Sequence, residues 1–159
     1  MVCLGNICRS PTAEGVLRKL VRERDLDAYI EVDSAGTSGW HDGEGPDPRT
    51  VQAALNRGYD LAPLVSRKVT QHDFDKHDYI LAMDAQNLHD LRSLCPRAQH
   101  GKLGTLLQYG NSALGNVPDP YDCGPQVFEQ VIDLCEQSCA ALLAHLIASH
   151  QLPARRGQS

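Results

Sequence analysis

The sequence predicts a single α/β domain with a parallel sheet, and two observations lead to this prediction. Short strand-like apolar runs alternate with amphipathic helical patterns, which is the order found in β–α–β units. The chain has 159 residues, a length typical of one domain. We expect roughly four strands, and no internal repeat is visible.

The first half of the chain contains two predicted helices and one predicted strand. Apolar residues at helical spacing predict a helix over residues 12–24. The run Tyr-Ile-Glu-Val predicts a strand within 29–34. A second helix is predicted over 48–57, and Gly58 is a typical residue to end it.

The second half continues the alternation. A short helix at 70–76 precedes the apolar run 79–83, and another helix covers 85–94 and ends before Pro96. A weaker strand is predicted at 102–106. The order again indicates parallel strands joined by helices.

A long final helix is predicted from after Gly124 to about Ser149. Its buried face is marked by apolar residues, namely Val127, Val131, Leu134, Leu142, Leu146 and Ile147. Residues 151–159 are polar and basic, so we expect a flexible tail after a domain that spans 1–150.

The loop that starts at Cys3 and ends at Arg9 is the most informative segment. Gly5 and Asn6 tolerate tight or left-handed conformations, and Ser10 is a candidate N-cap for the helix that follows. A loop that closes onto a helix start directs backbone N–H groups inward, where they bind phosphate. Because Cys3 would lie at the bottom of that cradle, we predict a covalent phosphate-transfer site.

Charge around the loop favours the thiolate that such chemistry needs. The Arg9 guanidinium and the helix N-terminus would both stabilise a negative sulfur on Cys3. Arg9 also presents a planar fork that binds two phosphate oxygens. Cysteine-to-arginine spacing alone is weak evidence, and Gly-Asn before a helix is an ordinary turn. The combination of all these features is what indicates a site.

Residues 2–14, Val-Cys-Leu-Gly-Asn-Ile-Cys-Arg-Ser-Pro-Thr-Ala-Glu, resemble the phosphate loop of the low-molecular-weight protein tyrosine phosphatases. The larger tyrosine phosphatases place a histidine directly before the cysteine, where this chain has Val2. The resemblance implies a three-layer α/β/α fold whose first strand leads into the loop. Only Met1 and Val2 precede Cys3, so we expect the first strand to be shortened or missing, and the chain to be less stable for it. The phosphate-binding residues implied are Leu4, Gly5, Asn6, Ile7, Cys8, Arg9 and Ser10.

Asp119 is the candidate general acid. It lies between two prolines in Val-Pro-Asp-Pro-Tyr, and a residue before proline is held extended, which presents its side chain. Pro-Asp-Pro is more commonly a surface turn. The family carries an Asp-Pro-Tyr segment whose aspartate is the acid, so the resemblance implies that role here. The family often has a second aromatic residue after the tyrosine, where this chain has Asp122.

The resemblance also implies the walls and supports of the site. Trp40 and Tyr121 would sandwich an aryl phosphate, although a single tryptophan is more often a packing residue. Asp84 would support the phosphate loop, and Ser10 would hydrogen-bond the thiolate. The family's Ser-His pair lacks its histidine around Ser66, so the support that it would give to Asn6 is either supplied elsewhere or absent. The Asp-Pro-Arg segment 47–49 is interpreted as a helix start with a structural salt link.

We therefore expect a cysteine-dependent protein tyrosine phosphatase that hydrolyses phosphotyrosine and aryl phosphates through a phosphocysteine intermediate. No metal and no cofactor are expected, because the loop itself supplies positive charge. One alternative is an arsenate reductase of the same fold, but its extra cysteine relay is not evident around Cys95. The other alternative is a non-catalytic phosphate-binding module.

Composition narrows the partners and the compartment. The formal charge of −5 and the lack of a basic stripe argue against nucleic acid. Six cysteines in no framework spacing favour the cytoplasm, and we expect no signal peptide. We expect no run to be long or apolar enough to span a membrane. Cys135 and Cys139 are expected to pack in the core. The oligomeric state is left open.

Overall fold

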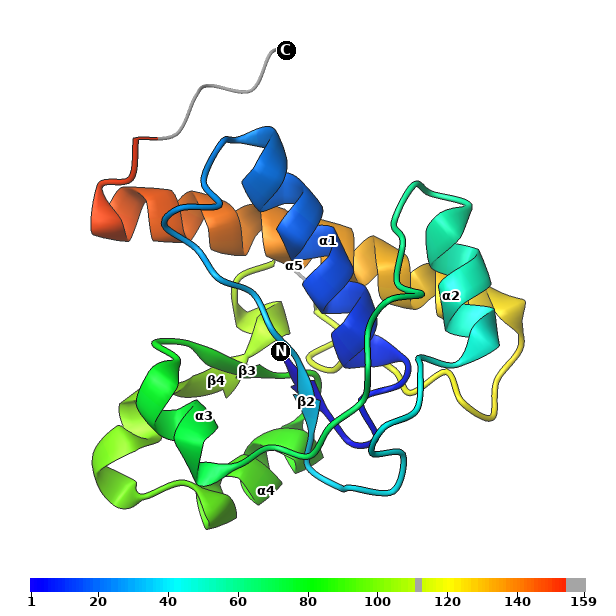
Figure 1. The fold of residues 1–159 in the computed structure, drawn as a ribbon, viewed down its shortest axis with the longest axis horizontal. Helices are drawn as coiled ribbons and strands as arrows, with labels where there is room; N and C mark the ends of the chain where they lie inside the picture. Colours follow the sequence, from blue (N-terminus) through cyan, green and yellow to red (C-terminus); the bar gives the residue numbers. More distant parts are fainter. Residues whose placement is uncertain (111–112, 154–159) are drawn as a thin grey trace.

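A parallel sheet lies between two layers of helices in the computed structural model, which describes residues 1–110 and 113–153 (Figure 1). The strand order in the described part is β2-β1-β3-β4, and all three pairings are parallel. The strands are β1 (Val2–Cys3), β2 (Ala35–Gly36), β3 (Ile80–Ala82) and β4 (Leu103–Thr105). The four-stranded parallel sheet is confirmed, and β1 is short, as expected.

The helices cover both faces of the sheet. They are α1 (Arg9–Glu23), α2 (Pro48–Leu55), α3 (Gln71–Lys76), α4 (Ala85–Leu94) and α5 (Pro125–His150), with short 3-10 helices η1 (Arg97–Lys102) and η2 (Leu106–Gln108). In Figure 1, α1, α2 and α5 lie on one side of the sheet, and α3 and α4 lie on the other. This arrangement confirms the three-layer prediction.

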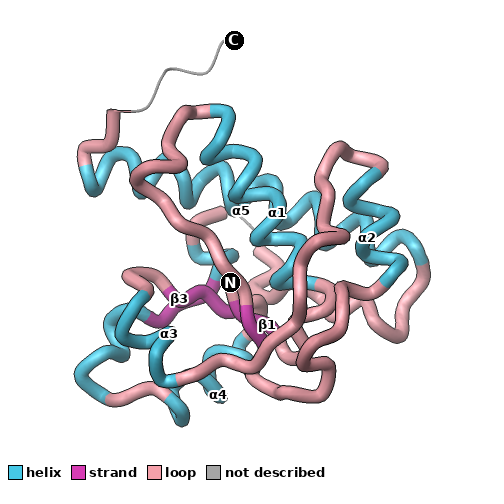
Figure 2. The backbone as a smooth tube through the Cα atoms, in the orientation of Figure 1, coloured by secondary structure: helices cyan, strands magenta, loops and turns pink. Residues whose placement is uncertain are grey.

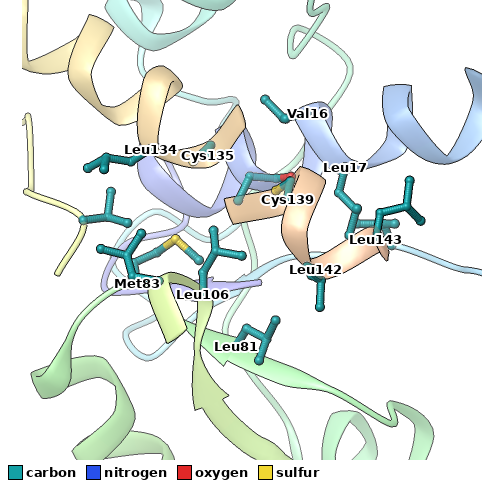
Figure 3. Close-up of a cluster of buried hydrophobic side chains, with 14 of the residues drawn as sticks. Val16, Leu17, Leu81, Met83, Leu106, Leu134, Cys135, Cys139, Leu142 and Leu143 are labelled. Carbon is teal, nitrogen blue, oxygen red and sulfur yellow. The ribbon is translucent and has the colours of Figure 1, made fainter. Parts of the chain in front are cut away.

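Side chains alternate along the strands between two apolar clusters. Val2 and Ile80 belong to the cluster against α3 and α4, whereas Cys3 and Leu81 belong to the cluster against α1 and α5. Figure 3 shows the second cluster, where residues of α1, β3 and α5 meet. Because both faces of the sheet are covered, neither face of a strand needs polar residues.

The strand predicted at 29–34 is wrong in position. The strand β2 comprises Ala35 and Gly36, and the tube in Figure 2 is loop before them. A strand needs a partner, and β1 pairs Val2 with Ala35 and Cys3 with Gly36. Residues further upstream therefore have no β1 residue opposite them to complete a ladder.

The start of α1 also differs from the expectation. The helix begins at Arg9 with Cys8 as its N-cap, and no side chain caps it. The Ser10 N-cap prediction was therefore wrong, because Ser10 lies inside the first turn and its hydroxyl is engaged with the loop. The remaining predicted helices and strands form, with shifted ends.

The helix α5 corrects the expectation that no run is apolar enough for a membrane. By length and composition alone it would qualify. Its apolar residues have another role, because Val131, Leu134, Cys135 and Leu142 are buried against α1 and the sheet. The packing of Cys135 and Cys139 in this core is confirmed.

The helix ends at Gln151, which takes a left-handed conformation with φ of 51°. Most of the predicted tail, residues 154–159, lies outside the described residues. The division into a 1–150 domain and a flexible tail stays a prediction.

Candidate active site

The loop between β1 and α1 lies at the carboxyl end of β1, where ligands bind in parallel α/β folds. Its tightest point is Asn6, whose φ of 56° is left-handed. Asparagine tolerates this region better than most residues. Gly5 does not have a positive φ, so the left-handed position expected in this pair falls on Asn6 alone. A different glycine, Gly36, allows close approach, because a Cβ there would lie 2.7 Å from the Leu4 carbonyl oxygen.

The Asn6 side chain fixes the loop through a buried network. Its amide nitrogen donates to the hydroxyls of Ser10 at 2.8 Å and Ser34 at 2.9 Å. Its side-chain oxygen accepts from the backbone N–H of Arg67 at 3.0 Å. The backbone carbonyl of Asn6 accepts from the Ser66 hydroxyl at 2.5 Å. These contacts supply the support for which the sequence offered no histidine. Sequence reasoning missed Ser34, which is distant in the chain and carries no motif.

Cys3 lies at the bottom of this loop with 3% of its surface exposed. Its Sγ is 3.0 Å from the Ser10 hydroxyl. That hydroxyl accepts a hydrogen bond from Asn6, and its own proton can reach either the sulfur or, at 3.4 Å, the Ala35 carbonyl oxygen. The structure thus brings Cys3 and Ser10 into the contact that the sequence predicted.

Arg9 is buried and bound on several sides. Its Nη1 donates to an Asp84 oxygen at 2.5 Å and to the Val117 carbonyl at 3.2 Å, while Nη2 lies 3.7 Å from an Asp119 oxygen. Burial alone would lower the pKa of Arg9. The negative charges of Cys3, Asp84 and Asp119 outweigh it, so the pKa is raised and the guanidinium stays charged.

Asp84 connects the end of β3 to the loop. It is the N-cap of α4, where one carboxylate oxygen accepts from the Asn87 N–H at 2.7 Å. Its other oxygen binds Arg9. The supporting position expected for Asp84 is confirmed.

The segment that carries Asp119 is anchored beside the same strand end. The Val117 N–H donates to the Met83 carbonyl at 2.8 Å, and Pro120 is fully buried. The Asp119 side chain is half exposed, and it accepts from the Tyr121 N–H at 3.2 Å. The structure therefore brings an exposed carboxyl, distant in sequence, to Arg9.

Two exposed aromatic residues lie on loops that belong to the site. Trp40 is 76% exposed and Tyr121 is 48% exposed. Trp40 precedes His41, whose ring covers Gly5 closely enough that a Cβ on Gly5 would lie 3.1 Å from its Cδ2. Both aromatic rings are free to meet a substrate, and their sandwich arrangement stays a prediction.

Arg49 lies against the ring of Tyr121, a contact that sequence reasoning missed. Its guanidinium carbon lies 5.5 Å from the Tyr121 ring centre and 4.8 Å from that of Phe128. It also pairs with Asp47, the N-cap of α2, at 2.9 Å. The salt link expected between Asp47 and Arg49 is confirmed.

The other cysteines differ from Cys3 in their surroundings. Burial raises the pKa of Cys8 to about 12 and that of Cys139 to about 12. Burial also raises the pKa values of Cys95 and Cys135, and Cys123 is exposed. In the described residues, therefore, these buried thiols are poor candidates for a relay of reactive sulfurs.

A possible metal-ligand group lies away from the loop. Oxygen and nitrogen atoms of Asp33, Asp73 and His77 lie within 4.8 Å of one another. The Arg67 guanidinium already bonds both carboxylates, each at 2.8 Å. This cluster is an ion-pair network centred on Arg67.

The fold and loop together define a class of protein: an enzyme with a cysteine and an arginine in an anion-binding loop at the carboxyl end of a parallel strand. Comparison with known families agrees. Residues 1–152 match the family described as low molecular weight phosphotyrosine protein phosphatase. The chain belongs to this family.

Individual relatives support the same assignment. The low molecular weight protein-tyrosine-phosphatase YfkJ of Bacillus subtilis is 41% identical over 95% of this chain and 96% of its own. The human low molecular weight phosphotyrosine protein phosphatase is 40% identical over 89% and 90%. A crystal structure of protein tyrosine phosphatase from Entamoeba histolytica, with Hepes in the active site, superposes with a TM-score of 0.89 at 38% identity, covering 95% and 96%. The chain is a protein tyrosine phosphatase of the cysteine-dependent, low-molecular-weight type.

Proposed function

We propose that Cys3, Arg9 and Asp119 carry the phosphatase reaction of this chain. This proposal rests on the position of the Arg9 side chain. Arg9 ends the loop that starts at Cys3, and its Nη2 lies 3.7 Å from a carboxylate oxygen of Asp119. Arg9 and the N–H groups of residues 4–10 bind the phosphoryl oxygens. The Ser10 hydroxyl lies 3.0 Å from the Cys3 sulfur, where it can donate to the attacking thiolate.

In the first step the Cys3 sulfur attacks phosphorus. An S–P bond forms as the bond from phosphorus to the aryl oxygen breaks, and Asp119 gives its proton to the leaving oxygen. The negative charge that develops on the phosphoryl group is met by Arg9 and the loop amides.

In the second step water replaces the sulfur. Asp119, now a carboxylate, takes a proton from the water as its oxygen bonds to phosphorus. The S–P bond breaks, inorganic phosphate leaves, and the Cys3 thiolate is restored. The same carboxyl thus acts as acid and then as base.

The substrates proposed are phosphotyrosine in proteins and small aryl phosphates. Exposed aromatic rings at Trp40 and Tyr121 support this choice, because they can stack on an aryl ring. Asp122 is polar and exposed where the family often has a second aromatic, so this side of the site favours substrates with a polar or basic neighbour.

The setting proposed is a cytoplasmic enzyme that needs no metal or other cofactor, enters no membrane and binds no nucleic acid. Free cysteines and a net charge of −5 support it. The oligomeric state is not part of the proposal.

The mechanism is tested by p-nitrophenyl phosphate hydrolysis of Cys3→Ser, with Cys123→Ser as the matched control. We expect kcat to fall at least about a thousandfold for the first variant and to change little for the second. Turnover that survives in a folded Cys3→Ser protein would refute the role of Cys3.

The two alternatives are separated by further assays. A single-turnover experiment should show a burst of nitrophenol, which a non-catalytic phosphate-binding module cannot produce. An arsenate reductase would consume arsenate with a thiol donor and would depend on a second cysteine. The buried thiols of Cys95, Cys135 and Cys139 argue against that dependence.

A further inference from the structure

The Asn6 side chain is held between two segments that are distant from each other in the chain. Residues 33–34 lie on one side, where the Ser34 hydroxyl accepts from the Asn6 amide nitrogen at 2.9 Å. Residues 66–67 lie on the other side, where the Arg67 backbone N–H donates to the Asn6 side-chain oxygen at 3.0 Å. We call these two segments the Asn6 clamp. Together they fix both ends of one amide group.

The direction of each hydrogen bond in the clamp is set by its neighbours. The Ser34 hydroxyl donates its proton to a buried carboxylate at 2.6 Å, so it accepts from Asn6. The backbone N–H of Arg67 can only donate. The Asn6 amide therefore turns its nitrogen toward Ser34, and the same nitrogen donates to Ser10 at 2.8 Å. Through this contact the clamp positions the hydroxyl that lies 3.0 Å from the nucleophilic sulfur.

One side chain ties the two halves of the clamp together. The Arg67 guanidinium pairs with a carboxylate oxygen of Asp33 at 2.8 Å, and Asp33 directly precedes Ser34. The other Asp33 oxygen accepts from the Ser34 N–H at 2.8 Å. The ion pair thus joins the residue next to one Asn6 contact to the residue that makes the other contact.

The same guanidinium is anchored on α3. It makes two hydrogen bonds to Asp73, at 2.9 Å from Nη1 and at 2.8 Å from Nη2. Burial raises the pKa of Asp73, but the Arg67 guanidinium and the Thr70 N–H outweigh it, so the pKa is lowered and the carboxylate stays charged. A contact through two nitrogens fixes the direction of a guanidinium as well as its distance. Arg67 is therefore held in the position from which it reaches Asp33.

Backbone contacts also hold the half of the clamp that contains Arg67. The Arg67 carbonyl accepts from the Gly36 N–H at 2.8 Å, and Ser66 exchanges backbone hydrogen bonds with residues 43–44. These contacts do not depend on the guanidinium. We therefore expect the clamp to loosen, rather than to come apart, when the Arg67 side chain is changed.

We propose that Arg67 is a positioning residue for the phosphate loop, because it joins the two halves of the clamp that hold the Asn6 amide. The inference rests on the proposed role of this loop in binding the phosphoryl group. Arg67 acts through Asn6, whose left-handed backbone turns the loop so that its N–H groups face an oxyanion. A looser clamp lets Asn6 leave that conformation, so the loop binds oxyanions less tightly and the enzyme turns over more slowly.

The test uses two arginines that both bind several carboxylates. Arg67→Met removes the charge but keeps much of the length of the side chain. Arg57→Met is the matched control, because the Arg57 side chain is 30% exposed, against 36% for Arg67. It also bonds three acidic side chains, namely Glu129, Asp133 and Glu136. We expect both variants to lower Tm by about 3–6 °C.

Calorimetric titration with inorganic phosphate separates positioning from stability. The dissociation constant should rise about tenfold in Arg67→Met and stay within about twofold of the native value in Arg57→Met. The kcat for p-nitrophenyl phosphate should fall about tenfold in the first variant only. It should fall by the same factor for phenyl phosphate, because proton transfer from Asp119 is unchanged. A lower Tm without either change in Arg67→Met, or equal changes in the two variants, would overturn the proposal.

Asp33→Asn is a second test that does not depend on the folding of Arg67→Met. It breaks the ion pair but keeps an oxygen that can accept from the Ser34 N–H. We expect the phosphate dissociation constant to rise about threefold, since Arg67 keeps its contacts with Asp73. The double variant should lose no more than Arg67→Met alone, because both changes remove the same contact. Additive losses would contradict the proposal.

The phosphate titration also keeps this proposal separate from the proposed function. A native chain without turnover would refute the phosphatase reaction of Cys3, Arg9 and Asp119. The phosphate affinities of the arginine variants would still decide whether Arg67 positions the loop.

Discussion

The two ends of β1 differ in how their polar groups are held and in what surrounds them. At the carboxyl end, the loop from Cys3 to Arg9 is held by Asn6, Ser10, Ser66 and Asp84 in a buried network. At the amino end, the Met1 ammonium donates to the Asp33 carbonyl beside a cavity that segments 29–35 and 76–81 help to line. One strand of two residues therefore separates the hydrogen-bonded loop at its carboxyl end from a cavity at its amino end.

The difference shows which contacts position the nucleophile. The loop is fixed mainly by side chains from other segments, such as Ser34 and Ser66, which bond Asn6 directly. The length of β1 contributes stability through the ladder and the core. We therefore expect changes at the carboxyl end to affect chemistry, and changes at the amino end to affect stability.

The largest effect is expected from Asp119→Asn, which removes the proton donor but keeps the shape. The value of kcat should fall about a hundredfold to ten-thousandfold. The loss should be greater with phenyl phosphate than with p-nitrophenyl phosphate, because the poorer leaving group needs the proton more. Steady-state kinetics with both substrates checks this.

Asp122→Asn is the matched control for that variant. It changes a neighbouring exposed carboxyl that no proposed step uses, so kcat should stay within about twofold. Equal losses in the two variants would mean that the segment's charge, rather than a proton on Asp119, matters.

The next effect concerns the network that completes the loop. Asn6→Ala removes three side-chain hydrogen bonds and places alanine at a φ of 56°. We expect a loss of about 3 kcal/mol in unfolding free energy, together with a lower kcat. Asn56→Ala, at an exposed asparagine with one side-chain bond to Gln52, should cost less than about 0.5 kcal/mol. Denaturant melts of both variants distinguish these outcomes, and equal losses would count against the network.

A smaller effect is expected from pH at the amino end. The Met1 ammonium has a lowered pKa in the folded chain and a value near 8.0 when unfolded. At pH values between these two pKa values the unfolded chain binds more protons than the folded chain. The free energy of unfolding therefore rises with pH, and the contribution of the Met1 amino group is full above pH 8.0. As the pH falls from 8.0 through the pKa of the folded chain, this contribution to the free energy of unfolding is lost.

Acetylation of Met1 isolates this contribution, because the groups that face the ammonium, Glu14, Asp33, Cys3 and Cys139, are unchanged. The melting temperature of the native chain should gain about 3 °C relative to the acetylated form between pH 6 and pH 9. Parallel curves for the two forms would show that the ammonium is not buried.

The smallest effect is expected from Arg49, which lies against the exposed Tyr121 ring. Arg49→Leu removes the cation that lies against the Tyr121 ring, while Arg49→Lys keeps a charge there. We expect KM for a phosphotyrosine peptide to rise on the order of threefold in the first variant and less in the second, with kcat nearly constant. A fall in kcat without a change in KM would assign Arg49 to the chemistry instead.

The sequence was sufficient to predict those parts of the site whose residues are close together in the chain. The Cys3 loop, the helix after it and the Asp119 segment could all be predicted, since each has a local pattern. The position of β2 could not, because it depends on which residues β1 reaches in register. The contacts of Ser34 with Asn6 and of Arg49 with Phe128 join segments distant in the chain, and no local pattern marks them.

The central claim is that the loop at the carboxyl end of β1 transfers phosphate through Cys3. Rapid acid quench during p-nitrophenyl phosphate turnover, followed by intact mass measurement, tests it most directly. We predict one phosphoryl adduct on the native chain and on Cys8→Ala, and none on Cys3→Ser. An adduct that persists in Cys3→Ser, or turnover by that variant at the native rate, would contradict the account.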